Sequence, residues 1–208
     1  MRIGISLSFL LQGPSLTQRG VGRYIVQQIL ATSTHRQGHE IIGLCPAEVE
    51  LAAVAPELSN APALTLHRLE PNPNADPHAV LRTAVKQLGL DVIHCPTPLF
   101  EPFRADLGTA VVATLYDAIP LAYPMHYLAA EGDFTPIYLE SARQLHRADH
   151  VLVISEATRR DALAYFGVAE EATTVAYPYA DSQFEALPQS VIDQRLERLR
   201  TSLKLPTG

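Results

Sequence analysis

Short apolar runs alternate along the chain with longer segments whose apolar residues recur at helical spacing. The first run covers residues 3–7, and Val21, Ile25 and Ile29 then follow at the period of a helix. Five further runs have the length of buried strands: residues 40–44, 64–69, 91–94, 109–115 and 151–154. The pattern predicts six strands that are separated mostly by helices.

The apolar runs of residues 110–113 and 151–154 show no alternation with polar residues. Strands of this kind are covered by helices on both faces, as in a parallel sheet. Helical patterns that supply the covering layers occupy residues 78–88, 138–147 and 156–166. We therefore predict an α/β fold of Rossmann-like, doubly wound class, with a mostly parallel sheet and helices on both faces.

The chain changes character after Pro178. Residues 179–189 have the pattern of a connector, and residues 190–203 have that of a charged amphipathic helix. We predict one domain over residues 1–188 and a linker helix over residues 189–208. This helix would lead toward a second domain, so we expect the chain to be part of a longer protein.

Composition narrows the classes of function. The 208 residues carry a formal net charge of -6, whereas domains that bind nucleic acid usually show clustered Lys and Arg. No stretch approaches the roughly 20 apolar residues of a membrane span, and the first residues do not resemble a signal segment. We expect a soluble, cytoplasmic protein with no nucleic-acid partner. Cys45 and Cys95 lack the spacing of a zinc site or a disulfide framework, which predicts buried, reduced thiols.

Open α/β sheets bind ligands beyond the carboxyl ends of their strands. After the first strand we expect a long loop over residues 9–19, followed by Gly-Val-Gly-Arg-Tyr at residues 20–24. Glycines at the start of a helix let a phosphate approach free backbone N–H groups. The alternative is that Gly20 and Gly22 only ease the chain from a loop into a helix.

Three common motifs are absent from the sequence. The third glycine of a dinucleotide fingerprint would stand where the chain has Ile25, and a Walker A motif does not occur. Gly-x-Ser-x-Gly is missing as well. These observations disfavour NAD binding, P-loop nucleotide hydrolysis and a hydrolase with a nucleophile elbow.

Asp117 lies just past the carboxyl end of the predicted strand of residues 109–115. Its carboxylate can accept hydrogen bonds from sugar hydroxyls or stabilise a developing positive charge. Alternatively, it caps the turn that follows.

Two further polar residues stand at strand ends. Ser155 precedes a predicted helix in the position of an N-cap. His94 ends a predicted strand, where a lone histidine usually serves as a structural hydrogen-bonding group, and with Cys95 it does not form a metal site.

Taken together, these segments resemble the N-terminal domain of the retaining GT-B glycosyltransferases, a family that includes glycogen-synthase-like and mannosyltransferase enzymes. The resemblance covers most of the chain. It rests on Gly-x-Gly-Arg-Tyr at residues 20–24, Tyr-Asp followed by Ile-Pro at residues 116–120, and Asp-Val-Ile-His at residues 91–94. The most specific segment is the block Arg-Ala-Asp, strand, Ser-Glu-x-Thr-Arg-x-Asp at residues 147–161.

The resemblance implies an enzyme that transfers a sugar from a nucleotide-diphosphate donor to an acceptor hydroxyl with retained anomeric configuration, as a hexosyltransferase does, without a metal or another cofactor. The implied partners are a nucleotide-sugar donor, a carbohydrate or lipid-linked acceptor, and a C-terminal domain of the same protein that holds most of the donor. Peripheral contact with a membrane is left open. We expect the isolated chain to be inactive.

The resemblance also implies site residues. Asp117 carries over as the catalytic candidate together with Tyr116, although many relatives have a histidine at the place of Tyr116. The cleft for donor and acceptor is expected to include Gly20, Gly22, Arg23, His94, Ser155 and Glu156. If Gly22 lies against the donor diphosphate, Gly22→Val should weaken use of the donor and leave the melting temperature within a few degrees. Two alternatives stay open: a non-catalytic module that binds a sugar or nucleotide, and half of a GT-B-type nucleotide-sugar epimerase.

Overall fold

The computed structural model describes residues 1–70, 76–99, 103–129, 134–178 and 186–204. The chain divides into two compact units, Met1–Pro178 and Tyr179–Gly208.

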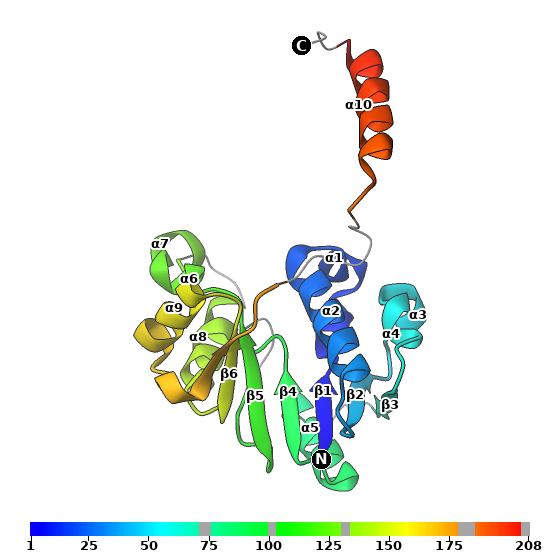
Figure 1. Ribbon diagram of the computed structural model, residues 1–208. Coiled ribbons are helices and arrows are strands. Elements are labelled where there is room, and N and C mark those ends of the chain that lie inside the picture. The colour runs from blue at the N-terminus through cyan, green and yellow to red at the C-terminus, as the bar shows by residue number, and fades with distance from the viewer. Residues whose placement is uncertain (71–75, 100–102, 130–133, 179–185, 205–208) are drawn as a thin grey trace. The chain divides into compact units, whose positions relative to one another are not determined.

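Within the described ranges, seven strands of the first unit form one sheet (Figure 1). They are β1 Arg2–Ser6, β2 Glu40–Pro46, β3 Leu64–Leu69, β4 Val92–Cys95, β5 Ala110–Leu115, β6 His150–Val153 and β7 Thr173–Val175. Their order is β3-β2-β1-β4-β5-β6-β7, and all neighbouring strands are parallel. The predicted Rossmann-like, doubly wound α/β class is confirmed.

The sequence pattern did not predict β7. This strand has only three residues and begins with two threonines, so it is too short to show a period. It forms through pairing with β6, in which Val151 lies opposite Thr173 and Val153 lies opposite Val175.

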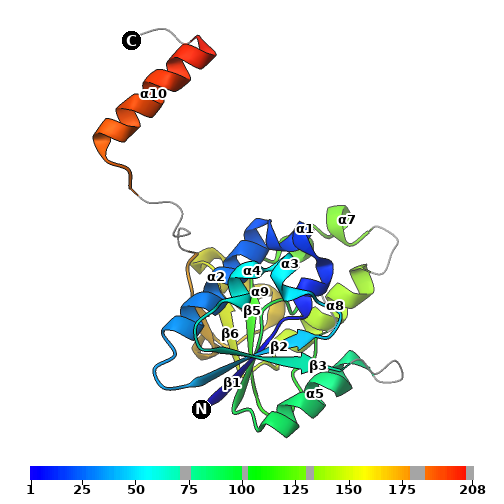
Figure 2. The same cartoon turned by 90° about the vertical axis from the view of Figure 1, so that its right-hand side faces the viewer.

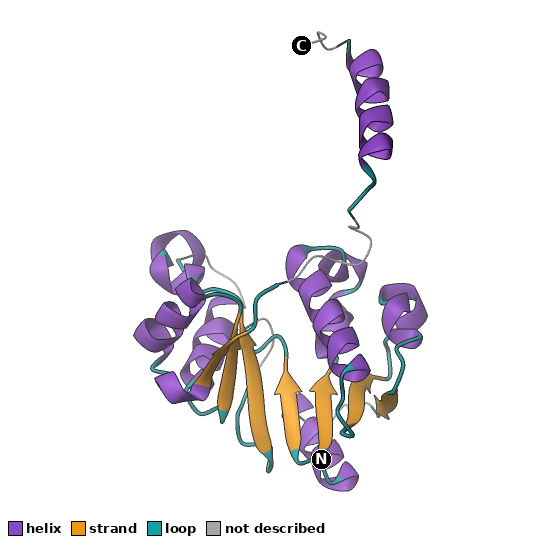
Figure 3. Ribbon diagram, viewed as in Figure 1, coloured by secondary structure: helices purple, strands orange, loops and turns teal. Residues whose placement is uncertain are grey.

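Helices cover both sides of the sheet in the first unit (Figure 3). They are α1 Pro14–Thr17, α2 Gly20–Thr34, α3 Leu51–Val54, α4 Pro56–Ser59, α5 Pro77–Leu88, α6 Ile119–Ala122, α7 Pro124–Tyr127, α8 Phe134–Leu145 and α9 Glu156–Phe166. The described residues of this unit also form two short 3-10 helices, η1 Ser8–Gln12 and η2 Glu170–Ala172.

The core consists of two hydrophobic clusters. Successive strand residues point to opposite faces, and Ile41 and Ile42 of β2 accordingly belong to different clusters. Ile41 packs in the cluster that contains Ile25 of α2, whereas Ile42 packs in the cluster that contains Val85 of α5. Figure 2 shows these two helices on opposite sides of the sheet. Because helices cover both faces of the sheet, both sides of a strand are buried, and its residues do not alternate between apolar and polar.

The predicted loop over residues 9–19 is wrong, because η1 and α1 occupy most of it. Phe9, Leu10 and Leu16 of these short helices are buried, and burial of such side chains stabilises a fold by about 1.5–3 kcal/mol each. The apolar residues are too few to show a helical period, so tertiary packing decides the structure of this segment.

The second predicted region that differs is the helix expected over residues 138–147. In the structure α8 begins one turn earlier, at Phe134. Pro136 lies within this first turn, where the missing N–H of a proline removes no helical hydrogen bond. The earlier start places the Phe134 side chain on a regular element.

The second unit contains α10, Gln189–Leu203. It begins after Pro188 and ends at Lys204, which adopts a left-handed conformation with φ 53°. The helix carries Leu196, Leu199 and Leu203 at the spacing of one face. A helix at this position agrees with the sequence pattern, while its role as a linker stays a prediction.

Cys45 and Cys95 are both buried and form no disulfide bond, as predicted. None of the helices in the described part of the chain combines the length and the hydropathy that crossing a bilayer requires.

Candidate functional site

The direction in which the sheet grows reverses between β1 and β4. The chain adds β2 and β3 on one side of β1, and it then adds β5, β6 and β7 beyond β4 on the other side. Open α/β sheets bind ligands at the carboxyl ends of their strands next to such a reversal. Because all strands are parallel, the segments that follow β1, β4, β5 and β6 lie along this same edge.

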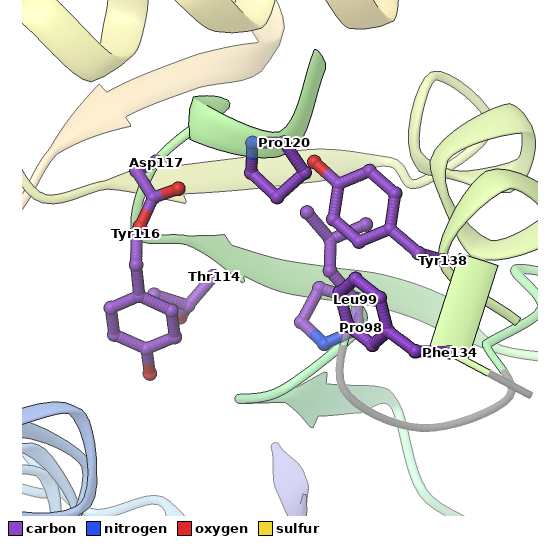
Figure 4. Close-up of a pocket in the computed structure, with 8 residues that line it drawn as sticks. All are labelled: Pro98, Leu99, Thr114, Tyr116, Asp117, Pro120, Phe134 and Tyr138. Carbon is purple, nitrogen blue, oxygen red and sulfur yellow. The ribbon is translucent and has the colours of Figure 1, made fainter. Parts of the chain in front are cut away.

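A cleft opens beyond the carboxyl end of β5 (Figure 4). Its walls come from the segment after β4, the end of β5 with the segment that follows, and the start of α8. The lining residues are Pro98, Leu99, Thr114, Tyr116, Asp117, Pro120, Phe134 and Tyr138. The cleft is therefore mostly apolar, with a few polar groups at defined places.

The geometry of Asp117 is compatible with both of the roles that the sequence left open. Its Oδ1 accepts a 2.9 Å hydrogen bond from the backbone N–H of Ile119, at the start of α6. The residue also lines the cleft and is only half-buried. The turn contact restrains the carboxylate and leaves its remaining lone pairs available to a ligand.

The ring of Tyr116 packs edge-to-face against Tyr24 of α2, with ring centroids 5.7 Å apart and an interplanar angle of 90°. Figure 4 shows the Tyr116 hydroxyl directed away from the Asp117 carboxylate. Burial raises the pKa of Tyr116 well above its ordinary value, and Tyr24 raises it further. The Tyr116 ring therefore packs between elements. Its hydroxyl does not point toward Asp117, and a catalytic role for Tyr116 stays a prediction.

His94 contacts a residue of the cleft wall. Its Nε2 is 2.8 Å from Oγ1 of Thr114, which lines the cleft, whereas His94 is not among the lining residues. His94 is only 8% exposed, and burial lowers the pKa of its imidazole to about 4. His94 is therefore neutral near pH 7 and holds Thr114, which matches the structural role that the sequence left as the alternative.

Ser155 is an N-cap, because its Oγ accepts a 3.1 Å hydrogen bond from the backbone N–H of Thr158. Thr158 Oγ1 in turn donates a 3.1 Å hydrogen bond to the carbonyl oxygen of Tyr116. Glu156 is exposed and lies 3.7 Å from Arg159 in an ion pair on the helix surface. Neither Ser155 nor Glu156 lines the cleft. Thr158 was not among the predicted site residues, although it belongs to the most specific block of the resemblance.

The two glycines of α2 differ in their surroundings. A Cβ at Gly22 would lie 2.1 Å from the carbonyl oxygen of Leu16 and 2.6 Å from Cα of Thr17. Gly22 is thus required for the close packing of α2 on α1, and the expectation that Gly22→Val would spare the stability is wrong. The error followed from the predicted loop, which left no helix for Gly22 to pack on. Gly20 is exposed, and the space at its Cβ position is open.

Arg23 lies next to Gly22 on α2. Its Nη1 is 2.9 Å from Oε1 of Glu57 on α4, and both side chains are partly exposed. An exposed ion pair of this kind contributes at most about 1 kcal/mol. A role for Arg23 in donor binding stays a prediction.

The two aromatic residues of α8 that line the cleft, Phe134 and Tyr138, were not among the sequence-based candidates. Their rings are 5.5 Å apart at 36° on α8. Aromatic residues on a helix usually belong to a core, so their type carries no signal for a site. Only the approach of α8 to the end of β5 shows that they share a cleft with Asp117.

The fold is similar to that of solved glycosyltransferase structures. A glycosyltransferase from Rickettsia africae matches with a TM-score of 0.52 and 14% identity over 100% of this chain and 50% of that one. Anabaena HepE in complex with UDP and glucose matches with a TM-score of 0.54 and 16% identity over 95% and 50% of the two chains. The chain thus spans about half the length of these structures, and at such identities the likeness shows the fold.

Fold and comparison together define the chain as the N-terminal, Rossmann-like half of a GT-B glycosyltransferase fold. Residues 19–184 match the model of glycosyltransferase family 4, and the chain belongs to that family. A search of curated protein sequences returns no significant match.

Proposed function

We propose that this chain forms one wall of the active site of a retaining glycosyltransferase, which moves a sugar from a nucleotide-diphosphate donor to an acceptor hydroxyl. One observation carries the proposal. In a member of glycosyltransferase family 4, a restrained carboxylate, that of Asp117, lines a cleft at the carboxyl end of β5.

Asp117 is suited to act on a sugar because its position is held from two sides. The N–H of Ile119 holds one carboxylate oxygen, and Thr158 holds the carbonyl of the preceding residue, Tyr116. A preorganised carboxylate can fix a sugar hydroxyl or stabilise the positive charge that develops at the anomeric carbon. Its contribution to the rate depends on this fixed placement.

The proposed donor is a nucleotide-diphosphate hexose. Support comes from the fold, since the solved structure of Anabaena HepE holds UDP and glucose. A second α/β domain of the same protein would bind most of the donor and close over the cleft, which excludes water and suppresses donor hydrolysis. Support for that domain is the half coverage of the solved structures. The acceptor would be a carbohydrate or a lipid-linked carbohydrate.

The exposed N-terminus of α2 at Gly20 is the proposed place where this half approaches the donor diphosphate. The open space at Gly20 permits close contact with backbone N–H groups, and the helix dipole favours an anion there. We propose that transfer requires no metal, with the charge of the leaving diphosphate offset by these N–H groups and by basic residues of the second domain.

Transfer assays on the full-length protein test the proposal. UDP-, GDP- and ADP-hexoses are offered with mono- and disaccharide acceptors, and the release of nucleoside diphosphate is followed together with the anomeric configuration of the product by NMR. We expect transfer with retention for one donor class and no turnover by the 208-residue chain alone. An inverted product would contradict retention, and turnover by the isolated chain would contradict its role as half of a site. Binding of a nucleotide sugar without transfer, or its epimerisation, would favour one of the two alternative functions.

A further inference from the structure

The chain leaves the sheet of the first unit at β7, the edge strand. Ala176 follows this strand of three residues directly. The N–H of Ala176 donates a 2.8 Å hydrogen bond to the carbonyl oxygen of Val153 on β6. Residues 176–178, called the exit segment below, are the last residues of the first unit. A connector to a following domain therefore starts from them.

Tyr24 of α2 holds the exit segment from the other half of the sheet. Its hydroxyl donates a 2.9 Å hydrogen bond to the carbonyl oxygen of Ala176, which lies 152 residues further along the chain. α2 packs in the cluster that contains Ile5 of β1, whereas β7 is the far edge of the sheet. Figure 1 shows the chain running from β7 toward α1 and α2. The backbone groups of Ala176 are thus bound to both β6 and α2.

The place of Tyr24 is fixed by the packing of its helix. It lies one turn after Gly20, the first residue of α2. In the same turn Gly22 packs so closely on the backbone of α1 that a Cβ would lie 2.1 Å from the carbonyl oxygen of Leu16. Burial raises the pKa of Tyr24, so its hydroxyl is protonated and donates at neutral pH. The hydrogen bond to Ala176 therefore starts from a rigid support.

The ring of Tyr24 makes a second contact, with the candidate catalytic region. It packs edge-to-face on Tyr116 at a centroid distance of 5.7 Å, a geometry that stabilises aromatic pairs. Tyr116 directly precedes Asp117, and both residues line the cleft. One side chain thus contacts the segment through which the chain leaves the unit and the residue next to the candidate carboxylate.

We propose that Tyr24 is a positioning residue, which fixes the pivot of the connector relative to Asp117. Hinges are a few residues at the ends of elements that absorb the rotation of one domain against another. The bond to Ala176 places this pivot beyond that residue. The inference rests on the proposed function, in which a second domain closes over the cleft. Closure then brings the donor to a defined place relative to Asp117, because Tyr24 locates both the pivot and the strand end.

A positioning role and a purely structural role of the hydroxyl have different consequences. Without the bond to Ala176 the start of the connector gains conformations, and closure has to order them again. The closed arrangement is then less populated, and the apparent affinity for a donor held between two domains falls. A bond that only stabilised the first unit would lower the melting temperature and leave the affinity for the donor unchanged.

Hydrogen exchange of the full-length protein, followed by mass spectrometry, tests the anchor without any substrate. Tyr24→Phe removes the hydroxyl and keeps the ring. Residues 174–178 should exchange about fivefold faster in this variant, because one of the hydrogen bonds that hold Ala176 is lost. Exchange of β4, Val92–Cys95, should not change, which separates local release from a loss of global stability. Tyr165→Phe on α9, where the side chain is 48% exposed, is the matched control and should behave as the unmodified protein.

Steady-state kinetics of the same variants test the role in transfer. Tyr24→Phe should raise the KM for the donor about fivefold and keep kcat within about twofold, since the ring still packs on Tyr116. Tyr24→Leu removes both contacts and should also lower kcat, on the order of tenfold, because Asp117 loses its support. Melting temperatures show whether each variant is folded, and Tyr24→Phe by itself decides the proposal if Tyr24→Leu is not.

The two measurements distinguish failure of this inference from failure of the proposed function. Faster exchange of residues 174–178 together with a raised KM for the donor supports the positioning role. Unchanged exchange in Tyr24→Phe would overturn the anchor, and an unchanged KM would overturn its role in closure while leaving the proposed function intact. Faster exchange in a protein that transfers no sugar would support the anchor and contradict the proposed function.

Discussion

Thr158 on α9 donates a 3.1 Å hydrogen bond to the carbonyl oxygen of Tyr116, the residue that precedes Asp117. The two partners are 42 residues apart in the sequence. Thr158 is buried, and its own N–H is held by Ser155, so the contact fixes the end of β5 to the start of α9. Two segments of the family resemblance are thereby joined next to the cleft.

Replacement of this threonine should affect stability and transfer together. Thr158→Val keeps the shape of the side chain and removes the hydroxyl, so we expect a loss of about 1–2 kcal/mol in the free energy of unfolding. In the full-length protein, turnover should also fall because Asp117 loses support. Urea denaturation and the transfer assay measure the two effects. Thr83→Val on α5, an exposed threonine, is the control, and equal stability of the two variants would show that the hydrogen bond contributes little.

The glycines of α2 should respond differently to a single added methyl group. Gly22→Ala places a Cβ against the backbone of α1, and we expect it to reduce the free energy of unfolding by about 2–3 kcal/mol or more. Gly20→Ala adds its Cβ in open space and should be neutral or stabilise by up to about 1 kcal/mol. Urea midpoints of the two variants provide the comparison. A Gly22→Ala protein as stable as Gly20→Ala would refute the packing role.

Variants of Asp117 can separate the turn contact from the chemistry. Asp117→Asn retains an oxygen that accepts from the N–H of Ile119, so its melting temperature should stay close to that of the unmodified protein. Loss of the charge should lower turnover of the full-length protein on the order of 10²-fold. Asp117→Ala removes the contact as well and should cost about 1 kcal/mol of stability in addition. Normal turnover in Asp117→Asn would leave Asp117 as a structural residue only.

His94 should make the stability of the fold depend on pH. Its pKa is lowered from 6.5 to about 4 in the folded state, so the unfolded chain binds more protons between these values. The contribution of neutral, buried His94 to the free energy of unfolding is fully present above about pH 6.5. It declines as the pH falls toward 4 and changes no further below that. Between these two pH values the free energy of unfolding should fall by on the order of 3 kcal/mol. Urea unfolding of the unmodified chain and of His94→Gln across this range measures the difference, and parallel pH profiles would contradict the shift.

Much of the fold could be predicted from local patterns. The apolar runs of residues 110–113 and 151–154 correctly indicated buried parallel strands, because a strand covered on both faces has no polar side. The helix over residues 156–166 and its N-cap Ser155 were also predicted correctly, since cap and period are local properties. The segment of η1 and α1 was not predicted, because its structure depends on where Phe9 and Leu16 become buried.

The candidate site divides in the same way. The sequence by itself determined the α/β class, the resemblance to GT-B glycosyltransferases and the place of Asp117 beyond the carboxyl end of a strand, because each of these follows from residue order along the chain. Only the tertiary structure decided that the Tyr116 ring packs against Tyr24 and that Tyr138 shares a cleft with Asp117. Such contacts join residues from different elements, and their formation depends on side-chain direction and packing, which no local pattern specifies.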